Sequence, residues 1–261
     1  MENKKAIFLF NESFTMAMPW ALAGYECHAF DGKHEGSKTH QFGNNGGSIT
    51  NHHFWFQAEK GDLDIIAISK IVGPGVKFIA SFAECTYLTT TGARWFYHPD
   101  DKHLPTKDRR PHPSYPNRRK DQENAVILAR MVQRMAALFE AVNADGSEVP
   151  WMLENPAISS LNTLWRKPDY TFDPCDYGGY LREGDPHPLF PDVYPPQDAY
   201  RKNTGIWCGG GFIMPGKIPV PAPKGFPGFL KAGGKSARTK EIRSTTPGGF
   251  AKAVFVFNAE F

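Results

Sequence analysis

Residues 76–96 read VKFIASFAECTYLTTTGARWF, and this stretch sets the interpretation of the whole chain. The run Val76–Phe82 is mostly apolar, β-branched or aromatic, which predicts a buried strand. It leads into Glu84 and Cys85 and then into a polar loop of three threonines. Open α/β sheets place their chemistry at the carboxyl ends of their strands, so Cys85 is a candidate functional residue. The ordinary alternative is that Cys85 is a small core residue.

Length and composition predict a globular protein with one domain that spans residues 1–261. Of the 261 residues, 41% are hydrophobic and 13% are aromatic, which is enough to bury a sizeable core. The 22 prolines and 25 glycines predict long irregular segments. The net charge of +3 permits a polyanionic partner without requiring one.

The four cysteines are widely spaced, and no two of them form a CxxC pair. Because the sequence shows no signal peptide and no apolar run of transmembrane length, we expect free thiols, a reducing cytoplasm and no membrane partner. The adjacent His52 and His53 would point to opposite sides of a strand, and no nearby cysteine completes a zinc set. No metal site is therefore predicted.

The N-terminal segment predicts a strand–helix–strand unit of the type that binds nucleotide cofactors. Ala6–Phe10 and Tyr25–Phe30 are apolar runs typical of buried strands, and Thr15–Ala23 is the predicted helix between them. Asp31 follows the second strand, where such units place an acid against a ribose hydroxyl. The usual glycine-rich turn is replaced by residues 11–15, NESFT, so an ordinary βαβ unit is the alternative. The candidate cofactor-binding residues are Phe10, Asn11, Ser13, Phe14, Thr15, Asp31 and Asp62.

The remaining hydrophobic patterns predict the other elements of an α/β sheet. Asp62–Ser69 is predicted as a third strand and Val149–Leu153 as a further one. Residues 121–144 show the clearest helical spacing of the chain, with methionines that we expect in the core. A strand is predicted to end at Cys208, and Phe250–Phe257 is predicted as a final helix or strand.

A second acidic residue, Glu154, stands at the end of the predicted strand Val149–Leu153 and is followed by Asn155 and Pro156. Proline is expected to stop the strand there. The carboxylate would then face the same crevice as Cys85 if the two strands are neighbours. An exposed loop glutamate is the alternative.

Three polar segments are predicted as loops: Gly32–Gly47, residues 97–120 and residues 157–240. The segment 97–120 is basic and proline-rich, which fits either a solvated loop or contact with phosphates. Prolines and aromatic residues dominate the segment 157–240, and its last part, Pro215–Lys240, is expected to be mobile or ordered by substrate. The lysines and arginines of this last part would suit an acidic backbone.

Taken together, four segments resemble motifs of the DNA cytosine-C5 methyltransferase family, in particular its short phage-type members. Residues 8–31, FLFNESFTMAMPWALAGYECHAFD, resemble the motif that binds S-adenosylmethionine. Residues 80–96, ASFAECTYLTTTGARWF, resemble the motif with the catalytic cysteine, and residues 151–156, WMLENP, the motif with the catalytic glutamate. CDYGG at 175–179, followed by YRKNTGIW at 200–207, resembles the later motif that places a basic residue against the target base. The order of all four matches the family.

The resemblance implies a Rossmann-like class I methyltransferase fold, with a mostly parallel sheet flanked by helices. It implies that Cys85 adds to C6 of a cytosine flipped out of DNA, and that protonated Glu154 stabilises the ring. Arg201 would hold the base or a phosphate, and S-adenosylmethionine would donate the methyl group. Residues 157–240 would contact the substrate in place of a target-recognition domain, and the protein would act in the cytoplasm of a bacterium or of a phage-infected bacterial host.

Two departures from the family pattern open alternatives. Glu84 precedes Cys85 where the family has proline, and the first motif lacks its glycines. If Glu84 activates water, a 5,10-methylenetetrahydrofolate donor would give hydroxymethylcytosine. A second alternative is the same chemistry on free dCMP. A third is a non-catalytic relative that binds DNA or a protein.

Overall fold

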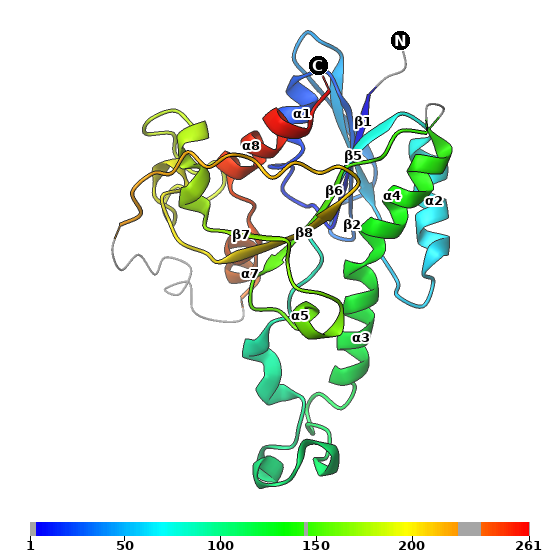
Figure 1. The fold of residues 1–261 in the computed structure, drawn as a ribbon, viewed down its shortest axis with the longest axis vertical. Helices are drawn as coiled ribbons and strands as arrows, with labels where there is room; N and C mark the ends of the chain where they lie inside the picture. Colours follow the sequence, from blue (N-terminus) through cyan, green and yellow to red (C-terminus); the bar gives the residue numbers. More distant parts are fainter. Residues whose placement is uncertain (1–3, 144–145, 224–235, 261) are drawn as a thin grey trace.

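The computed structural model describes residues 4–143, 146–223 and 236–260, which form one eight-stranded mixed sheet with helices on both faces (Figure 1). The strands are β1 (Lys5–Leu9), β2 (Glu26–Asp31), β3 (Lys38–Phe42), β4 (Gly47–His53), β5 (Val76–Ser81), β6 (Trp151–Pro156), β7 (Tyr170–Phe172) and β8 (Thr204–Gly209). The α-helices are α1 (Met18–Leu22), α2 (Asp62–Val72), α3 (Arg118–Ala129), α4 (Met131–Val142), α5 (Leu161–Leu164), α7 (Ala237–Ser244) and α8 (Gly248–Asn258). The 3₁₀ helices are η1 (Thr90–Trp95), η2 (Pro99–His103), η3 (Thr106–Asp108), η4 (Pro174–Tyr180) and η5 (Pro196–Asp198).

The strand order across the sheet is β3-β4-β2-β1-β5-β6-β8-β7. The five strands from β4 to β6 in this order run parallel to one another. β3 pairs antiparallel with β4, β8 pairs antiparallel with β6, and β7 pairs antiparallel with β8. The predicted α/β class with a mostly parallel sheet is therefore confirmed, and the order is compatible with a Rossmann-like fold.

The central strand β1 sends its side chains alternately into two hydrophobic cores, one on each face of the sheet. Ile7 and Leu9 lie in the core that α2 and α4 cover, whereas Ala6 and Phe8 lie in the core that α1 and α8 cover. Successive side chains of a strand point to opposite faces, so a strand buried on both faces has a continuous apolar sequence. This explains the run AIFL in β1.

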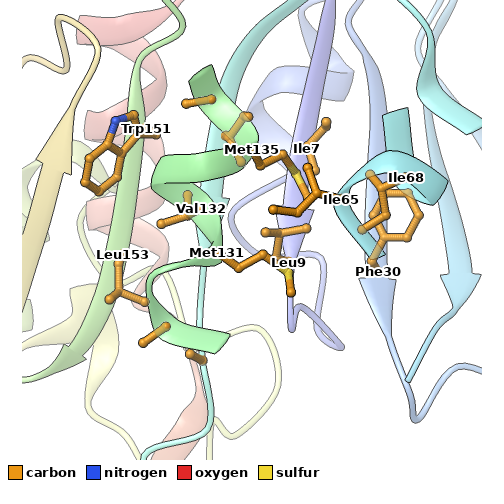
Figure 2. Packing of buried hydrophobic residues seen from close by; sticks show 14 of the residues in the cluster. Ile7, Leu9, Phe30, Ile65, Ile68, Met131, Val132, Met135, Trp151 and Leu153 are labelled. Atoms are coloured by element: carbon orange, nitrogen blue, oxygen red, sulfur yellow. The ribbon is translucent and has the colours of Figure 1, made fainter. Parts of the chain in front are cut away.

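The core beneath α4 is built from the helix that the sequence predicted most clearly. Figure 2 shows Met131 and Met135 of α4 directed toward Ile7 and Leu9 of β1. Both methionines are fully buried, which confirms that they are core residues. The predicted helix 121–144 is in fact two helices, because α3 ends and α4 begins at Arg130, where ψ is −8°.

The prediction of a third strand at Asp62–Ser69 is wrong, because these residues lie in α2. The buried apolar residues of α2 are Ile65, Ile68 and Val72, which is the spacing of one helix face, and Gly73 ends the helix with φ +69°. A short apolar run does not by itself distinguish a buried strand from a helix. The third parallel strand is instead β4, which begins at Gly47, the last residue of the predicted loop Gly32–Gly47. The antiparallel strand β3 lies inside that predicted loop.

Other boundaries also differ from the sequence expectations. The first helix, α1, begins only at Met18, with a proline in its first turn. Glu154–Pro156 do not follow β6 but form its last three residues. The C-terminal segment Phe250–Phe257 lies in a helix, α8. Within the segment 157–240, the strand predicted to end at Cys208 is confirmed as β8, whereas β7 and several short helices were not predicted. Lys224, Lys231 and Lys235 lie outside the described residues.

Candidate active site

The sheet reverses its winding direction at β1, which pairs with β2 on one side and with β5 on the other. In open α/β sheets, ligands bind in the crevice outside the carboxyl ends of the strands at such a switch point. The turn after β1, residues 10–17, and the segment after β5, residues 82–89, border this position. The first turn carries predicted cofactor residues, and the second carries Cys85.

The turn after β1 has a backbone conformation that usually requires glycine. Phe10 has φ +54° and Phe14 has φ +56°, in the left-handed region that is strained for bulky residues. Phe10 packs against Phe56 with 4.2 Å between the ring centroids, which helps to hold the turn. Ser13 and Thr15 are partly buried and contact each other through their hydroxyls at 3.2 Å. Two bulky residues therefore adopt positive φ angles in this turn, which contains no glycine.

Two buried polar atoms stand beside the switch point without hydrogen-bond partners among the described residues. They are Oδ1 of Asn11, just after β1, and Oγ of Ser81, at the end of β5. An unpaired buried polar atom costs about 1–3 kcal/mol. Their presence on neighbouring strands at this position is consistent with a site that a ligand or water completes.

The ends of β2 and β4 lie on the same side of the switch point as the turn after β1 and add further residues there. Burial raises the pKa of Asp31, and the backbone N–H of Lys33, 2.8 Å from its carboxylate, acts in the opposite direction. The ring of Trp55 covers the backbone at Gly32, so a Cβ at Gly32 would lie 2.4 Å from that ring. Trp55 is nevertheless 65% exposed. An acid and an open indole ring thus lie together after two adjacent strands.

Asp62, a predicted cofactor-binding residue, does not lie in the secondary structure that the sequence predicted for it. It lies in the first turn of α2 rather than in a strand, is exposed, and forms an ion pair of 2.7 Å with Arg134 of α4. The remaining predicted residues of this group are in the β1 turn or at the end of β2.

On the opposite side of the switch point, side chains from distant elements hold the segment after β5. Asn155 of β6 donates from Nδ2 to the carbonyl of Ala83 at 2.9 Å, within the buried part of the site. The carbonyl of Cys85 accepts from the backbone N–H groups of Leu88 and Thr89 at 3.0 and 2.9 Å. Cys85 therefore begins a tight helical turn.

Three more carbonyls of this segment are also bonded. Arg118 of α3 donates to the carbonyl of Thr86 at 3.1 Å, and Gln122 of α3 donates to that of Tyr87 at 3.2 Å. The carbonyl of Leu88 accepts from the backbone N–H of Ser160 at 2.6 Å. We call residues 83–89 the cysteine loop. Its backbone is fixed by β6, α3 and the start of α5, which places Cys85 in one position.

Glu154 reaches the same region because β6 is offset along β5, so that only the first half of β6 pairs with it. The β5–β6 pairing stops at Ser81 and Leu153, whereas β6 continues to Pro156 along β8. Glu154 and Asn155 therefore lie beyond the end of β5, where the chain of β5 turns into the cysteine loop. The expectation that β5 and β6 are neighbours is confirmed, and both Cys85 and Glu154 are partly buried.

Three ionisable side chains, those of Cys85, Glu154 and Lys202, influence one another's pKa values or charge in this region. Burial raises the pKa of the Cys85 thiol, the nearby Glu154 carboxylate raises it further, and Lys202 lowers it. Burial also raises the pKa of Glu154, while Lys202 lowers it. Cys85, Glu154 and Lys202 thus share one electrostatic environment, in which burial favours the neutral thiol and the neutral carboxylic acid.

Glu84 lies on the outer side of the cysteine loop. It is exposed, and its carboxylate accepts a hydrogen bond of 2.6 Å from the hydroxyl of Thr86. Its charge still adds to the raised pKa of Cys85, as a smaller contribution than that of Glu154.

The basic residue beside Cys85 and Glu154 is Lys202, which sequence reasoning missed in favour of Arg201. Lys202 is partly buried, and its Nζ lies 3.4 Å from the carbonyl of Thr245. Arg201 is exposed and acts instead on Cys175, whose pKa is raised chiefly by burial while Arg201 acts in the opposite direction. Adjacent residues of an extended segment point to opposite sides, so the motif YRKN offered two candidates that only the fold could separate.

In the described part of the chain, no group of three or more His, Cys, Asp or Glu side chains is placed to hold a metal ion. No helix within residues 4–143, 146–223 and 236–260 is long and apolar enough to span a membrane. A scan against protein-family models finds no matching family, and a search of curated proteins finds no significant match. The fold and the site define an α/β protein with a cysteine–carboxylate–lysine site beside the switch point of its sheet.

Proposed function

We propose that this protein transfers a one-carbon group to C5 of cytosine in DNA through a covalent intermediate on Cys85. The observation that carries the proposal is the convergence of Cys85, Glu154 and Lys202 beyond the carboxyl ends of β5 and β6. Cytosine C5 is a weak nucleophile. Addition of a thiolate to C6 removes the aromaticity of the ring and makes C5 reactive.

In the proposed reaction, the sulfur of Cys85 bonds to C6 of the cytosine, and the electron pair moves through the ring toward N3. The protonated carboxyl of Glu154 donates to N3 and neutralises the charge that develops there. With a donor bound, C5 would bond to its one-carbon group while the bond from that carbon to the donor breaks and the donor keeps the electron pair. A base removes the C5 proton, the C5–C6 double bond forms again, and the thiolate leaves.

The raised pKa of Glu154 fits the role of the acid, whereas burial raises the pKa of the Cys85 thiol and opposes the thiolate that the addition requires. Burial raises the pKa of Glu154, which favours the acid form that can donate to the base. A neutral Glu154 also no longer raises the pKa of Cys85, so the same protonation favours the thiolate. Lys202 further stabilises the thiolate and takes the role that the sequence assigned to Arg201.

We propose S-adenosylmethionine as the donor, because the turn after β1 keeps positive φ angles without glycines. When bound, this group supplies an electrophilic methyl carbon. Asp31 would accept hydrogen bonds from its ribose hydroxyls, and Trp55 would stack on its adenine ring. The unpaired Oδ1 of Asn11 offers a further acceptor beside the same turn.

Trapping with DNA that contains 5-fluorocytosine tests the covalent step. With the one-carbon donor present, C5 would carry both the transferred carbon and fluorine. No proton is then left for a base to remove, so the thiolate cannot leave and the adduct migrates as a protein–DNA species in a denaturing gel. We expect an adduct with the unchanged protein and with Cys208→Ser, which removes another partly buried thiol. We expect none with Cys85→Ser. An undiminished adduct in Cys85→Ser would reject Cys85 as the nucleophile.

Product analysis separates the alternatives. Mass spectrometry of nucleosides should show 5-methylcytosine when S-adenosylmethionine is the only donor. A hydroxymethyl product that requires 5,10-methylenetetrahydrofolate would replace that donor and give Glu84 a role in water activation. Reaction with dCMP but not with DNA would change the substrate, and DNA binding without any adduct would indicate a non-catalytic relative.

A further inference from the structure

The positive charge of the chain is concentrated in residues 94–120, which we call the basic lobe. This segment holds eight of the 30 Lys and Arg residues but only three of the 27 Asp and Glu residues, which leaves 22 basic and 24 acidic residues for the rest of the chain. In Figure 1 the lobe projects away from the sheet at the lower end of the view, beyond α3 and α5. The net positive charge of the protein therefore comes from one protruding element.

The lobe has a defined internal structure. Asp101, almost fully buried, accepts hydrogen bonds from the backbone and the guanidinium of Arg110 at 2.7–2.9 Å. Residues 97 and 111 form a β-bridge, and the backbone N–H of His98 donates to the carbonyl of Arg110 at 2.9 Å. These contacts close the segment on itself, so its charges are displayed in a fixed arrangement.

Besides the buried Arg118, six cations of the lobe form no ion pair with any carboxylate of the described residues. They are Arg94, Lys102, Lys107, Arg109, Arg119 and Lys120. Three of them lie over aromatic rings: Arg94 over Trp95 at 4.8 Å, and Arg109 and Arg119 over Tyr97 at 5.5 and 4.9 Å. Asp101 pairs with Arg110 and Asp100 lies 3.6 Å from His98, so the carboxylates of the lobe leave these six cations without an acidic partner among the residues that the structure describes.

The base of the lobe is joined to the cysteine loop through Arg118. This guanidinium is buried between the rings of Tyr87 and Phe96, at 5.3 Å from each, and donates to the carbonyl of Thr86, the residue after Cys85. Gly92 leaves space for it, since a Cβ there would lie 2.2 Å from the guanidinium nitrogen. A ligand that binds to the lobe would therefore be held at a fixed position relative to the Cys85 thiol.

From these observations we infer that the basic lobe is the element that grips the phosphate backbone of duplex DNA beside the target cytosine. The inference rests on the proposed function. A row of unpaired cations with arginines and aromatic rings matches a polyanion with regularly spaced charges. A membrane surface fits less well, because Tyr115 is the one exposed large hydrophobic side chain among residues 94–120.

The test compares two pairs of lysines that carry the same charge. Lys102 and Lys107 lie in the lobe, and Lys60 and Lys70 lie just before and within α2; all four are exposed and form no ion pair with the described carboxylates. Binding of a fluorescent duplex is measured by anisotropy as a function of salt. The affinity falls as salt rises, and each lost phosphate contact makes the plot of log K against log salt less steep by about 0.9. K102Q/K107Q should therefore reduce the magnitude of the slope by about 1.8. K60Q/K70Q should leave the slope unchanged.

An unchanged slope in K102Q/K107Q, or an equal decrease in both double variants, would overturn the inference. So would binding of the lobe to anionic vesicles that DNA does not displace. These results differ from a failure of the proposed function, in which the unchanged protein forms no Cys85 adduct with 5-fluorocytosine DNA. At saturating DNA and low salt, K102Q/K107Q should still form that adduct, because neither lysine touches the site.

Discussion

The two segments that border the switch point are held in opposite ways. In the cysteine loop, the carbonyls of Ala83 and of residues 85–88 accept hydrogen bonds, three of them from Asn155, Arg118 and Gln122 on other elements. The turn after β1 is held by side-chain contacts, such as the packing of Phe10 on Phe56, and includes two strained phenylalanines and an unpaired amide oxygen. The side of the proposed nucleophile is thus preorganised, whereas the side of the proposed donor keeps an unsatisfied group that a ligand could pair with.

This difference predicts that the two sides respond differently to substitution. Damage to the cysteine loop should arise from residues far away in the sequence and should affect both stability and the covalent step. Damage to the donor side should be confined to ligand binding or to local strain. The following variants test this contrast.

The largest effect is expected for Asn155→Ala, which leaves the buried carbonyl of Ala83 without a donor. The free energy of unfolding in urea should fall by about 1–3 kcal/mol, and the rate of adduct formation with 5-fluorocytosine DNA should fall with it. Asn162→Ala is the matched control, because Asn162 donates to the carbonyl of Ala157, outside the cysteine loop, at 3.0 Å. An equal loss of adduct rate in both variants would contradict a special role for Asn155.

On the donor side, Trp55→Ala should weaken binding of S-adenosylmethionine by about 1–3 kcal/mol, the range measured when aromatic stacking on a base is removed. Trp55→Phe keeps a ring and should restore most of the affinity. Calorimetry gives both values. The unfolding free energy should change little, because Trp55 is largely exposed. If Trp55→Ala binds the donor as tightly as the unchanged protein, the ring of Trp55 does not hold the donor.

The strain in the turn after β1 predicts a smaller effect. Phe14→Gly and Phe14→Ala both remove the ring, but only glycine adopts φ +56° without strain. We expect the glycine variant to be more stable than the alanine variant by about 1 kcal/mol in urea unfolding. Alanine and glycine of equal stability would mean that the turn relaxes once the ring is removed.

The smallest effect concerns the pH dependence of Cys85. Alkylation by iodoacetamide requires the thiolate, so its rate should rise toward alkaline pH, because burial and Glu154 raise the pKa of Cys85. Glu154→Gln removes a negative neighbour and should move the profile to lower pH. Lys202→Gln removes a positive neighbour and should move it to higher pH. Subtraction of the rate of Cys85→Ser isolates this thiol, and shifts in the reverse directions would contradict the electrostatic interpretation.

Much of the sheet follows from local sequence. The apolar runs of β1, β2, β5 and β6 were long enough to predict strands. Cys85 was placed correctly after its strand, whereas Asp31, which was predicted to follow β2, is its last residue. Prediction from local sequence failed where one pattern of apolar and polar residues fits two kinds of secondary structure. The apolar run of α2 fits a buried strand as well as a helix, and β3 with β4 is too polar to stand out from a loop.

The arrangement of the candidate site was less accessible, because it depends on pairing between distant segments. Cys85 and Glu154 lie close together because β5 pairs with β6. The sequence did not establish this pairing, and the prediction depended on it. The choice of Lys202 over Arg201 depends on how the chain enters β8, and the buried Arg118 was hidden within a run of basic residues that indicates solvent exposure. Such features are fixed by tertiary contacts rather than by propensity.

The way α8 covers the sheet has a consequence for synthesis on the ribosome. Phe255 of α8 packs against Trp20 of α1 with 5.3 Å between the ring centroids, and the hydroxyl of Tyr25 donates to the carbonyl of Glu260, 235 positions later. Until these late residues emerge, the apolar face formed by Phe8 and its neighbours stays open to water. The nascent chain should therefore fold slowly and depend on chaperones while that face is uncovered.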